Sequence, residues 1–158
     1  MSDTEEIYWD EKKGIITLNT PRTQAVLGKA GDGVISLSAV KFHISTPFVS
    51  LILTSLDNES LAQSSHLLLA AVARSENAGT IYNPSRTLLR TSGTSPILME
   101  PVLGQASLTL GGRPLPQVFA LDPRGNRVGE IPVEESHGAL EIPLRGAHAY
   151  EILFGEKA

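Results

Sequence analysis

The chain contains no cysteine among its 158 residues. This absence excludes disulfide bonds, thiolate catalysis and zinc sites built on cysteine. It leaves the cellular compartment open, because a domain of this length can also fold outside the cell without disulfides.

The chain also lacks a large excess of either charge and lacks long apolar runs. The 13 basic and 17 acidic residues give a net charge of −4, and no basic stripe stands out, so we expect no nucleic-acid partner.

The longest apolar run, 67–73, is far shorter than the roughly 20 residues of a membrane span. Residues 1–13 are acidic and polar, unlike a signal peptide. The abrupt start predicts a module cut from a longer chain, with 1–158 forming a single domain.

What the chain has instead is evenly spaced turn residues. Its 14 glycines and 10 prolines separate short runs rich in Val, Ile, Leu and Thr, a pattern typical of an antiparallel β-sandwich with little or no helix. We expect Pro132 and Pro143 to lie at a sheet edge or at a strand end, because proline has no N–H for the ladder. The predicted strands are 5–9, 14–19, 24–28, 34–38, 40–44, 48–55, 66–73, 97–100, 105–110, 117–121, 127–133, 139–142 and 149–154.

The stretch SSHLLLAAVARSENAG, residues 64–79, admits two interpretations. A helix that begins after Ser60 or Ser64 would be apolar all round and would need complete burial. A central strand covered on both faces gives the same unbroken apolar run. The neighbouring segments on both sides are predicted strands, so we favour the strand.

The longest polar stretch, residues 74–96, follows this run. We expect a long loop or an irregular hairpin, and long loops in compact domains are often functional. Within it, the segment IYNPSR brings Tyr82, Asn83 and Arg86 close together.

No pattern in the sequence marks a catalytic centre. The four histidines lack metal-motif spacing, no G-x-S-x-G occurs, and GKAGDG at 28–33 lacks the end of a phosphate loop. The acids Asp57, Glu59, Glu76 and Glu100 are not distinguished as a catalytic pair. We therefore expect no enzyme, no catalytic residue and no cofactor, with a structural calcium ion near Asp57 and Asn58 as an alternative.

Five segments together resemble a known domain type. They are SDTEEIYWDEKKGIITLNTPRTQAVLG, FVSLILTSLDNESLAQSSHLLLAAVARSENAG, PILMEPVLGQASL, VFALDPRGNR and YEILF. In this order they resemble the C-terminal β-sandwich that follows the catalytic barrel in some bacterial glycoside hydrolases. Glu5 stands where that pattern has a glycine.

The resemblance implies a non-catalytic accessory module, with the catalytic acids in an absent barrel. As part of such an enzyme the domain would be secreted or at the cell surface. We expect it to bind a polysaccharide or oligosaccharide, because sugar rings stack on aromatic side chains and amides and guanidinium groups bridge hydroxyls. Tyr8 and Trp9 are neighbours, so in a strand they point to opposite faces. The candidate binding residues are Trp9, Tyr8, Tyr82, Asn83, Arg86 and Asn77.

The alternative is a structural spacer or docking domain that packs on the catalytic barrel and binds no soluble ligand. Exposed apolar surface on the isolated module would favour this alternative. The sequence does not identify a glycan, the activity of a parent enzyme or the oligomeric state.

Overall fold

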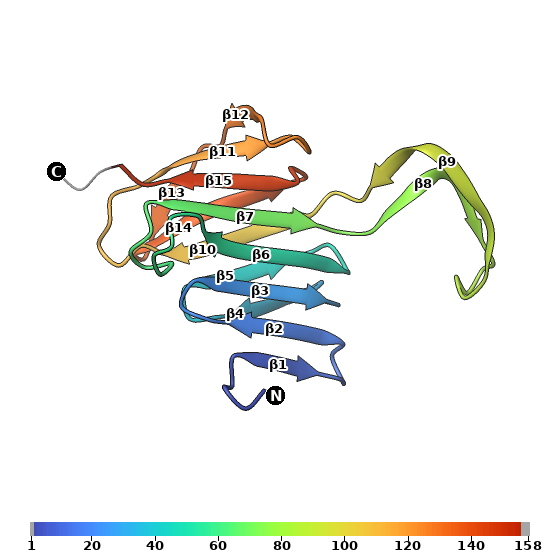
Figure 1. Cartoon of the computed structure of the whole chain (residues 1–158), viewed down its shortest axis with the longest axis horizontal. Coiled ribbons are helices and arrows are strands. Elements are labelled where there is room, and N and C mark those ends of the chain that lie inside the picture. The colour runs from blue at the N-terminus through green and yellow to red at the C-terminus, as the bar shows by residue number, and fades with distance from the viewer. Residues whose placement is uncertain (1, 156–158) are drawn as a thin grey trace.

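The structure is a computed structural model that describes residues 2–155. Two antiparallel sheets pack face to face as a β-sandwich, and a two-stranded arm projects from one end (Figure 1). The described part contains no helix, and accordingly none that could cross a membrane. The predicted all-β sandwich is confirmed.

The larger sheet has eight strands. In spatial order they are β1 (Ile7–Asp10), β2 (Ile15–Asn19), β3 (Thr23–Gly28), β6 (Val49–Ser55), β7 (His66–Val72), β15 (Ala149–Leu153), β11 (Gln117–Leu121) and β12 (Arg127–Glu130).

The smaller sheet has five strands, and the arm has two. The smaller sheet runs β13 (Glu134–Ser136), β14 (Ala139–Arg145), β10 (Leu103–Thr109), β5 (Val40–Ile44) and β4 (Gly33–Ser36). The arm pairs β8 (Ser75–Tyr82) with β9 (Leu89–Met99).

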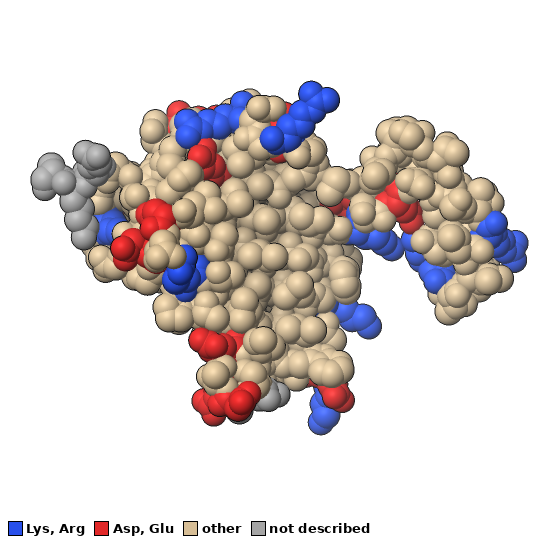
Figure 2. Space-filling view, in the orientation of Figure 1, with Lys and Arg blue, Asp and Glu red and all other residues tan. Residues whose placement is uncertain are grey.

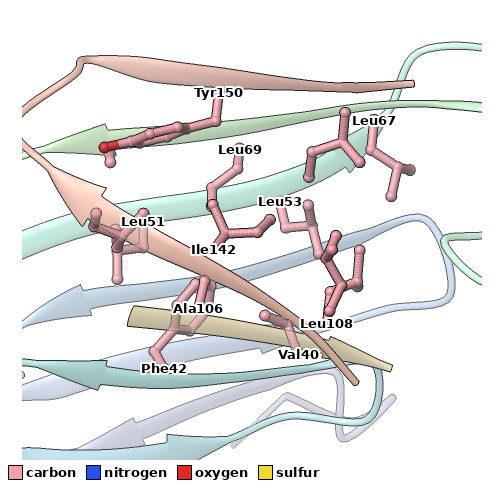
Figure 3. Packing of buried hydrophobic residues seen from close by; sticks show 14 of the residues in the cluster. Val40, Phe42, Leu51, Leu53, Leu67, Leu69, Ala106, Leu108, Ile142 and Tyr150 are labelled. Atoms are coloured by element: carbon pink, nitrogen blue, oxygen red, sulfur yellow. The ribbon is translucent and has the colours of Figure 1, made fainter. Parts of the chain in front are cut away.

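The core lies between the two sheets, where alternate residues of each strand are buried (Figure 3). On β6 and β7 the inward residues Leu51, Leu53, Leu67 and Leu69 are each at most 1% exposed. They pack against inward residues of the smaller sheet, among them Phe42. Burying each such side chain stabilises the fold by about 1.5–3 kcal/mol.

Most predicted strands are present. The segments 40–44 and 117–121 match their strands end to end, and 66–73 is β7, so the helix alternative for this run is wrong. The predicted strand 127–133 is too long: β12 ends at Glu130, before Pro132, and the next strand, β13, begins at Glu134 in the smaller sheet. Pro143 lies inside β14, beyond the point where β13 stops pairing with it, and thus at a local sheet edge.

The stretch predicted as a loop or an irregular hairpin forms the arm. β8 and β9 pair over most of their length, with register shifts after Asn77 and Ile81. Gly79 and Gly93 both have positive φ angles and lie in the middle of the arm, between paired positions. Figure 1 shows the arm curved into a hook away from the sandwich.

Candidate functional site

The six candidate binding residues lie in two separate places. Tyr8 and Trp9 are in β1, at one edge of the larger sheet. Asn77 and Tyr82 are in β8, and Asn83 and Arg86 follow at the tip of the arm. The arm and β1 lie apart in Figure 1, so these residues do not form one site.

Tyr8 and Trp9 point to opposite faces of the larger sheet. Tyr8, 49% exposed, lines a cleft of about 480 Å³ together with Ile15 and residues of β4. Trp9 is 59% exposed and is paired with Ile16 on the outer face of the sheet. Strand alternation places the two rings on different faces.

Asn83 organises the tip of the arm. Its Oδ1 accepts hydrogen bonds from the backbone N–H groups of Thr87 at 2.9 Å and Leu88 at 3.0 Å. Its Nδ2 donates to the hydroxyl of Ser85 at 3.0 Å. The amide therefore closes the turn between β8 and β9.

Arg86, at the tip of the arm, contacts two residues of β8. Its Nη2 donates to Oε2 of Glu76 at 2.7 Å, although the two residues are ten positions apart. Its guanidinium lies over the ring of Tyr82, 4.3 Å from the centroid, within the range of a cation–π contact. The arginine thus covers one face of the aromatic ring on which a sugar would stack.

Asn77 also bonds within the arm. Its Nδ2 donates to the carbonyl oxygen of Ser92 at 3.1 Å, and the Thr80 hydroxyl donates to the same oxygen at 3.0 Å. Both side chains, with Tyr82 and Leu89, line a hollow of about 330 Å³ on the arm. The predicted arm residues are therefore close together, but each one already contacts the arm itself.

The arm carries large apolar side chains on both of its faces. Ile97 and Leu98 are consecutive in a regularly paired stretch of β9 and so point opposite ways. Every residue of β8 and β9 is exposed or half-buried. The large apolar side chains and their exposures are Ile81 55%, Leu88 60%, Leu89 50%, Ile97 67%, Leu98 54% and Met99 37%.

The outer face of the larger sheet is apolar as well. Cross-strand partners share a face, so the register puts one continuous apolar set on this side. We call it the outer-face patch, and Figure 2 shows no charged side chain over its middle, across β7, β6 and β3. It comprises Ile7, Trp9, Ile16, Leu18, Ala25, Leu27, Ile52, Leu68, Ala70 and Val72.

The sequence predicted that 66–73 would be covered on both faces. In the structure, Leu67, Leu69 and Ala71 face the core, while Leu68 and Val72 remain half-buried on the outer side. Figure 1 shows no element of residues 2–155 over that side of the larger sheet. The expectation of two covered faces is therefore wrong for this chain alone.

One carboxylate of the outer face, that of Glu151, is held by two neighbours. Nε of Arg127 donates to Oε2 at 2.6 Å, and Nε2 of His66 lies 2.8 Å from Oε1. The Arg127 hydrogen bond lowers the pKa of Glu151 below its ordinary value, against the opposing effect of burial, and His66 adds to the lowering. Glu151 is therefore held as a carboxylate whose charge is compensated.

The loop expected to hold calcium is closed by hydrogen bonds. Oδ2 of Asp57 accepts from the backbone N–H of Ser65 at 2.7 Å and from its hydroxyl at 3.0 Å. Among residues 2–155, no three acidic or histidine side chains gather as a metal site. The calcium ion stays a prediction of the sequence.

Two surface features were not predicted from the sequence: the outer-face patch and the apolar character of the arm. Ile52, Leu68 and Val72 alternate with core residues, so one signal was the excess of apolar residues in β6 and β7. A comparison of the chain with protein-family models, with curated proteins and with solved structures finds no match.

Proposed function

We propose that the chain is a non-catalytic docking module that packs against another folded domain through its arm and its outer-face patch. The observation that carries the proposal is the arm. A two-stranded hairpin is at best marginally stable in water, and this one exposes large apolar side chains on both faces.

The shape of the neck supports the same role. Arg74 and Glu100 form an ion pair at 3.3 Å where the two strands leave the sandwich, and the Glu100 N–H donates to the Arg74 carbonyl oxygen at 2.9 Å. The arm is therefore anchored at its base and projects as a defined element. Contiguous apolar patches with a polar rim are typical of protein interaction sites.

The partner domain is proposed from the resemblance of the sequence to accessory domains of bacterial glycoside hydrolases. In such an enzyme the partner would be the catalytic barrel. The apolar side chains of the patch suit the apolar side chains of a folded protein, and Figure 2 shows no charged group over the middle of this face that could bind sugar hydroxyls.

Hydroxyl-radical footprinting tests the docking proposal. The native assembly that contains this chain is compared with the isolated chain, and modification is read at Trp9, Leu68 and Leu98. We expect several-fold protection at all three in the assembly, because buried side chains are shielded from the radical. Val128 and Leu115, exposed apolar residues off the patch and the arm, serve as controls and should stay unprotected. Equal modification in both samples would reject the proposal.

Polysaccharide binding is the second candidate. It is favoured by the 59% exposed ring of Trp9 and by the ring of Tyr8 in its cleft. The test is affinity electrophoresis of the chain in gels that contain soluble β-glucan, mannan or xylan. Retardation that is lost in Trp9→Ala or Tyr82→Ala would support this role, and no retardation in any gel would leave docking as the function. Release of hydrolysis or oxidation products would instead make the chain an enzyme.

A further inference from the structure

The smaller sheet ends short of the larger one. β4 is its last strand and pairs only with β5. Figure 1 shows β2 and β1 of the larger sheet lying beyond β4. The inward side chains of these two strands, among them Tyr8, Ile15 and Thr17, therefore face a cleft instead of a partner strand. All four residues of β4 line the other side of this cleft.

The size and lining of this cleft fit an extended segment. Its volume is about 480 Å³, within the usual range of roughly 300–1,000 Å³ for ligand clefts. Ile15 and Ile35, which also pack against the core, form part of its apolar lining. A free strand edge beside an apolar cleft is the arrangement that binds peptides by strand addition.

β4 also differs from the other edge strands of the two sheets. Proteins protect free edges with charged residues, proline or bulges. Within residues 2–155, β1 contains Asp10, β12 contains Arg127 and Glu130, and β13 contains Glu134 and Glu135. The sequence of β4 is GVIS, with no charged residue. Its edge therefore lacks this protection against pairing.

One charge in the cleft lacks an ion-pair partner. Lys29 lines the cleft, and its stem lies beside Gly14. Lys13 pairs with Asp10 at 3.6 Å, whereas no carboxylate of the described residues forms an ion pair with Lys29. A carboxylate on an incoming segment would complement it.

We propose that the cleft beside β4 accepts an extended peptide segment, which pairs with β4 as a sixth strand of the smaller sheet. Apolar side chains of the segment lie over Ile15 and Ile35, and an acidic residue lies next to Lys29. The cleft is formed without any residue of the arm, so this inference is independent of the docking function.

The test uses the chain itself and a synthetic peptide, acetyl-Thr-Val-Thr-Val-Thr-Glu-Thr-amide, whose Val and Glu side chains share one face of a strand. Binding is followed by amide chemical shifts in an NMR titration. We expect saturable shifts at Gly33–Ser36 and in β1 and β2. A control peptide with proline in place of the threonines should bind about tenfold more weakly or not at all, because it cannot donate to the edge. A peptide with lysine in place of glutamate should also bind more weakly.

Two matched variants locate the site. Val34 in β4 is 58% exposed and Val128 in β12 is 66% exposed. We expect Val34→Lys to weaken binding about tenfold, since a lysine protects a strand edge, and Val128→Lys to leave it unchanged. Absence of saturable shifts, equal binding of the proline peptide, or equal binding by Val34→Lys would overturn the proposal. A dimer in sedimentation analysis that Val34→Lys abolishes would overturn it in favour of a second copy.

Discussion

At the scale of single residues, Arg86 links two parts of the arm that are far apart in the sequence. Its guanidinium joins Glu76 near the base to Tyr82 near the tip. We expect Arg86→Ala to let the hook open, so that amide hydrogen exchange in β8 and β9 becomes several-fold faster. The unfolding free energy of the sandwich should change by less than about 1 kcal/mol, because the pair is surface-exposed.

The matched control for this prediction is Arg90→Ala. Arg90 is exposed in the arm and forms no ion pair among the described residues. Its removal should leave exchange in the arm unchanged. Equal effects of the two variants would show that Arg86 does not hold the curvature.

The lowered pKa of Glu151 predicts that the stability of the fold depends on pH. Its pKa is lowered in the folded chain by Arg127, so the ion pair stabilises the fold above the ordinary value of 4.5, and the stabilisation is lost as the pH falls through the folded pKa. We expect Glu151→Gln to cost about 1–2 kcal/mol at pH 7. The difference from the unsubstituted chain should shrink below pH 4.5 in urea unfolding. Glu130→Gln, a charge change on β12, the strand that contains Arg127, should show no such trend.

The sequence placed Tyr82, Asn83 and Arg86 correctly as neighbours, because they are adjacent in the chain. It also predicted that Tyr8 and Trp9 would point to opposite faces, which follows from strand alternation. The Glu76–Arg86 contact could not be predicted, because it needs the curvature of a hairpin whose register shifts twice. Whether these residues bind sugar stays a prediction.

At the scale of elements, the arm and the sandwich are separate. β8 and β9 contact each other extensively and add nothing to the buried core. Arg74 and Glu100 are already adjacent at the neck, so an Asn-Gly turn can join them when 75–99 are removed. We expect this deletion to leave the melting temperature of the sandwich within a few degrees, measured by circular dichroism, and to raise solubility.

A large drop in melting temperature on deletion would show that the arm supports the sandwich. The control for the new connection is a chain in which the tip 83–88 alone is replaced by Asn-Gly. This variant keeps β8 and β9 and should have the same solubility as the unsubstituted chain, because most of the exposed apolar side chains are still present.

Elements were predictable where one face of a strand meets the core. β5 and β11 show strict alternation of buried and less buried residues, and their predicted bounds are correct. β8 and most of β9 were not predicted as strands, because residues 75–79 and 90–96 lack the apolar alternation of a half-buried strand. Their pairing comes from the hairpin itself, without a core beneath it.

At the scale of the whole molecule, neighbouring leucines of β7 have different roles. Leu69 is 1% exposed in the core, while Leu68 is half-buried in the outer-face patch. We expect Leu69→Ala to cost about 2–5 kcal/mol of unfolding free energy, since it leaves a cavity. Leu68→Thr should cost less than about 1 kcal/mol and should weaken association with the partner. Denaturant unfolding gives the first comparison, and binding to the native partner gives the second.

A larger loss of unfolding free energy in Leu68→Thr than in Leu69→Ala would mean that the outer face supports the fold and is not a surface for a partner. Leu68→Thr introduces a β-branched residue, which strands favour, so a loss of stability could not be attributed to strand propensity. Ile52→Thr, on the neighbouring β6, is the companion variant and should behave like Leu68→Thr.

The molecule as a whole therefore has a packed sandwich, a bare apolar face and an apolar arm. The most direct test of the docking account is amide hydrogen exchange of residues 75–99, measured in the native assembly and in the isolated chain. The account predicts fast exchange in isolation and at least tenfold slower exchange in the assembly, because a partner that covers both faces of the hairpin suppresses its opening. Equally fast exchange in both samples would contradict it.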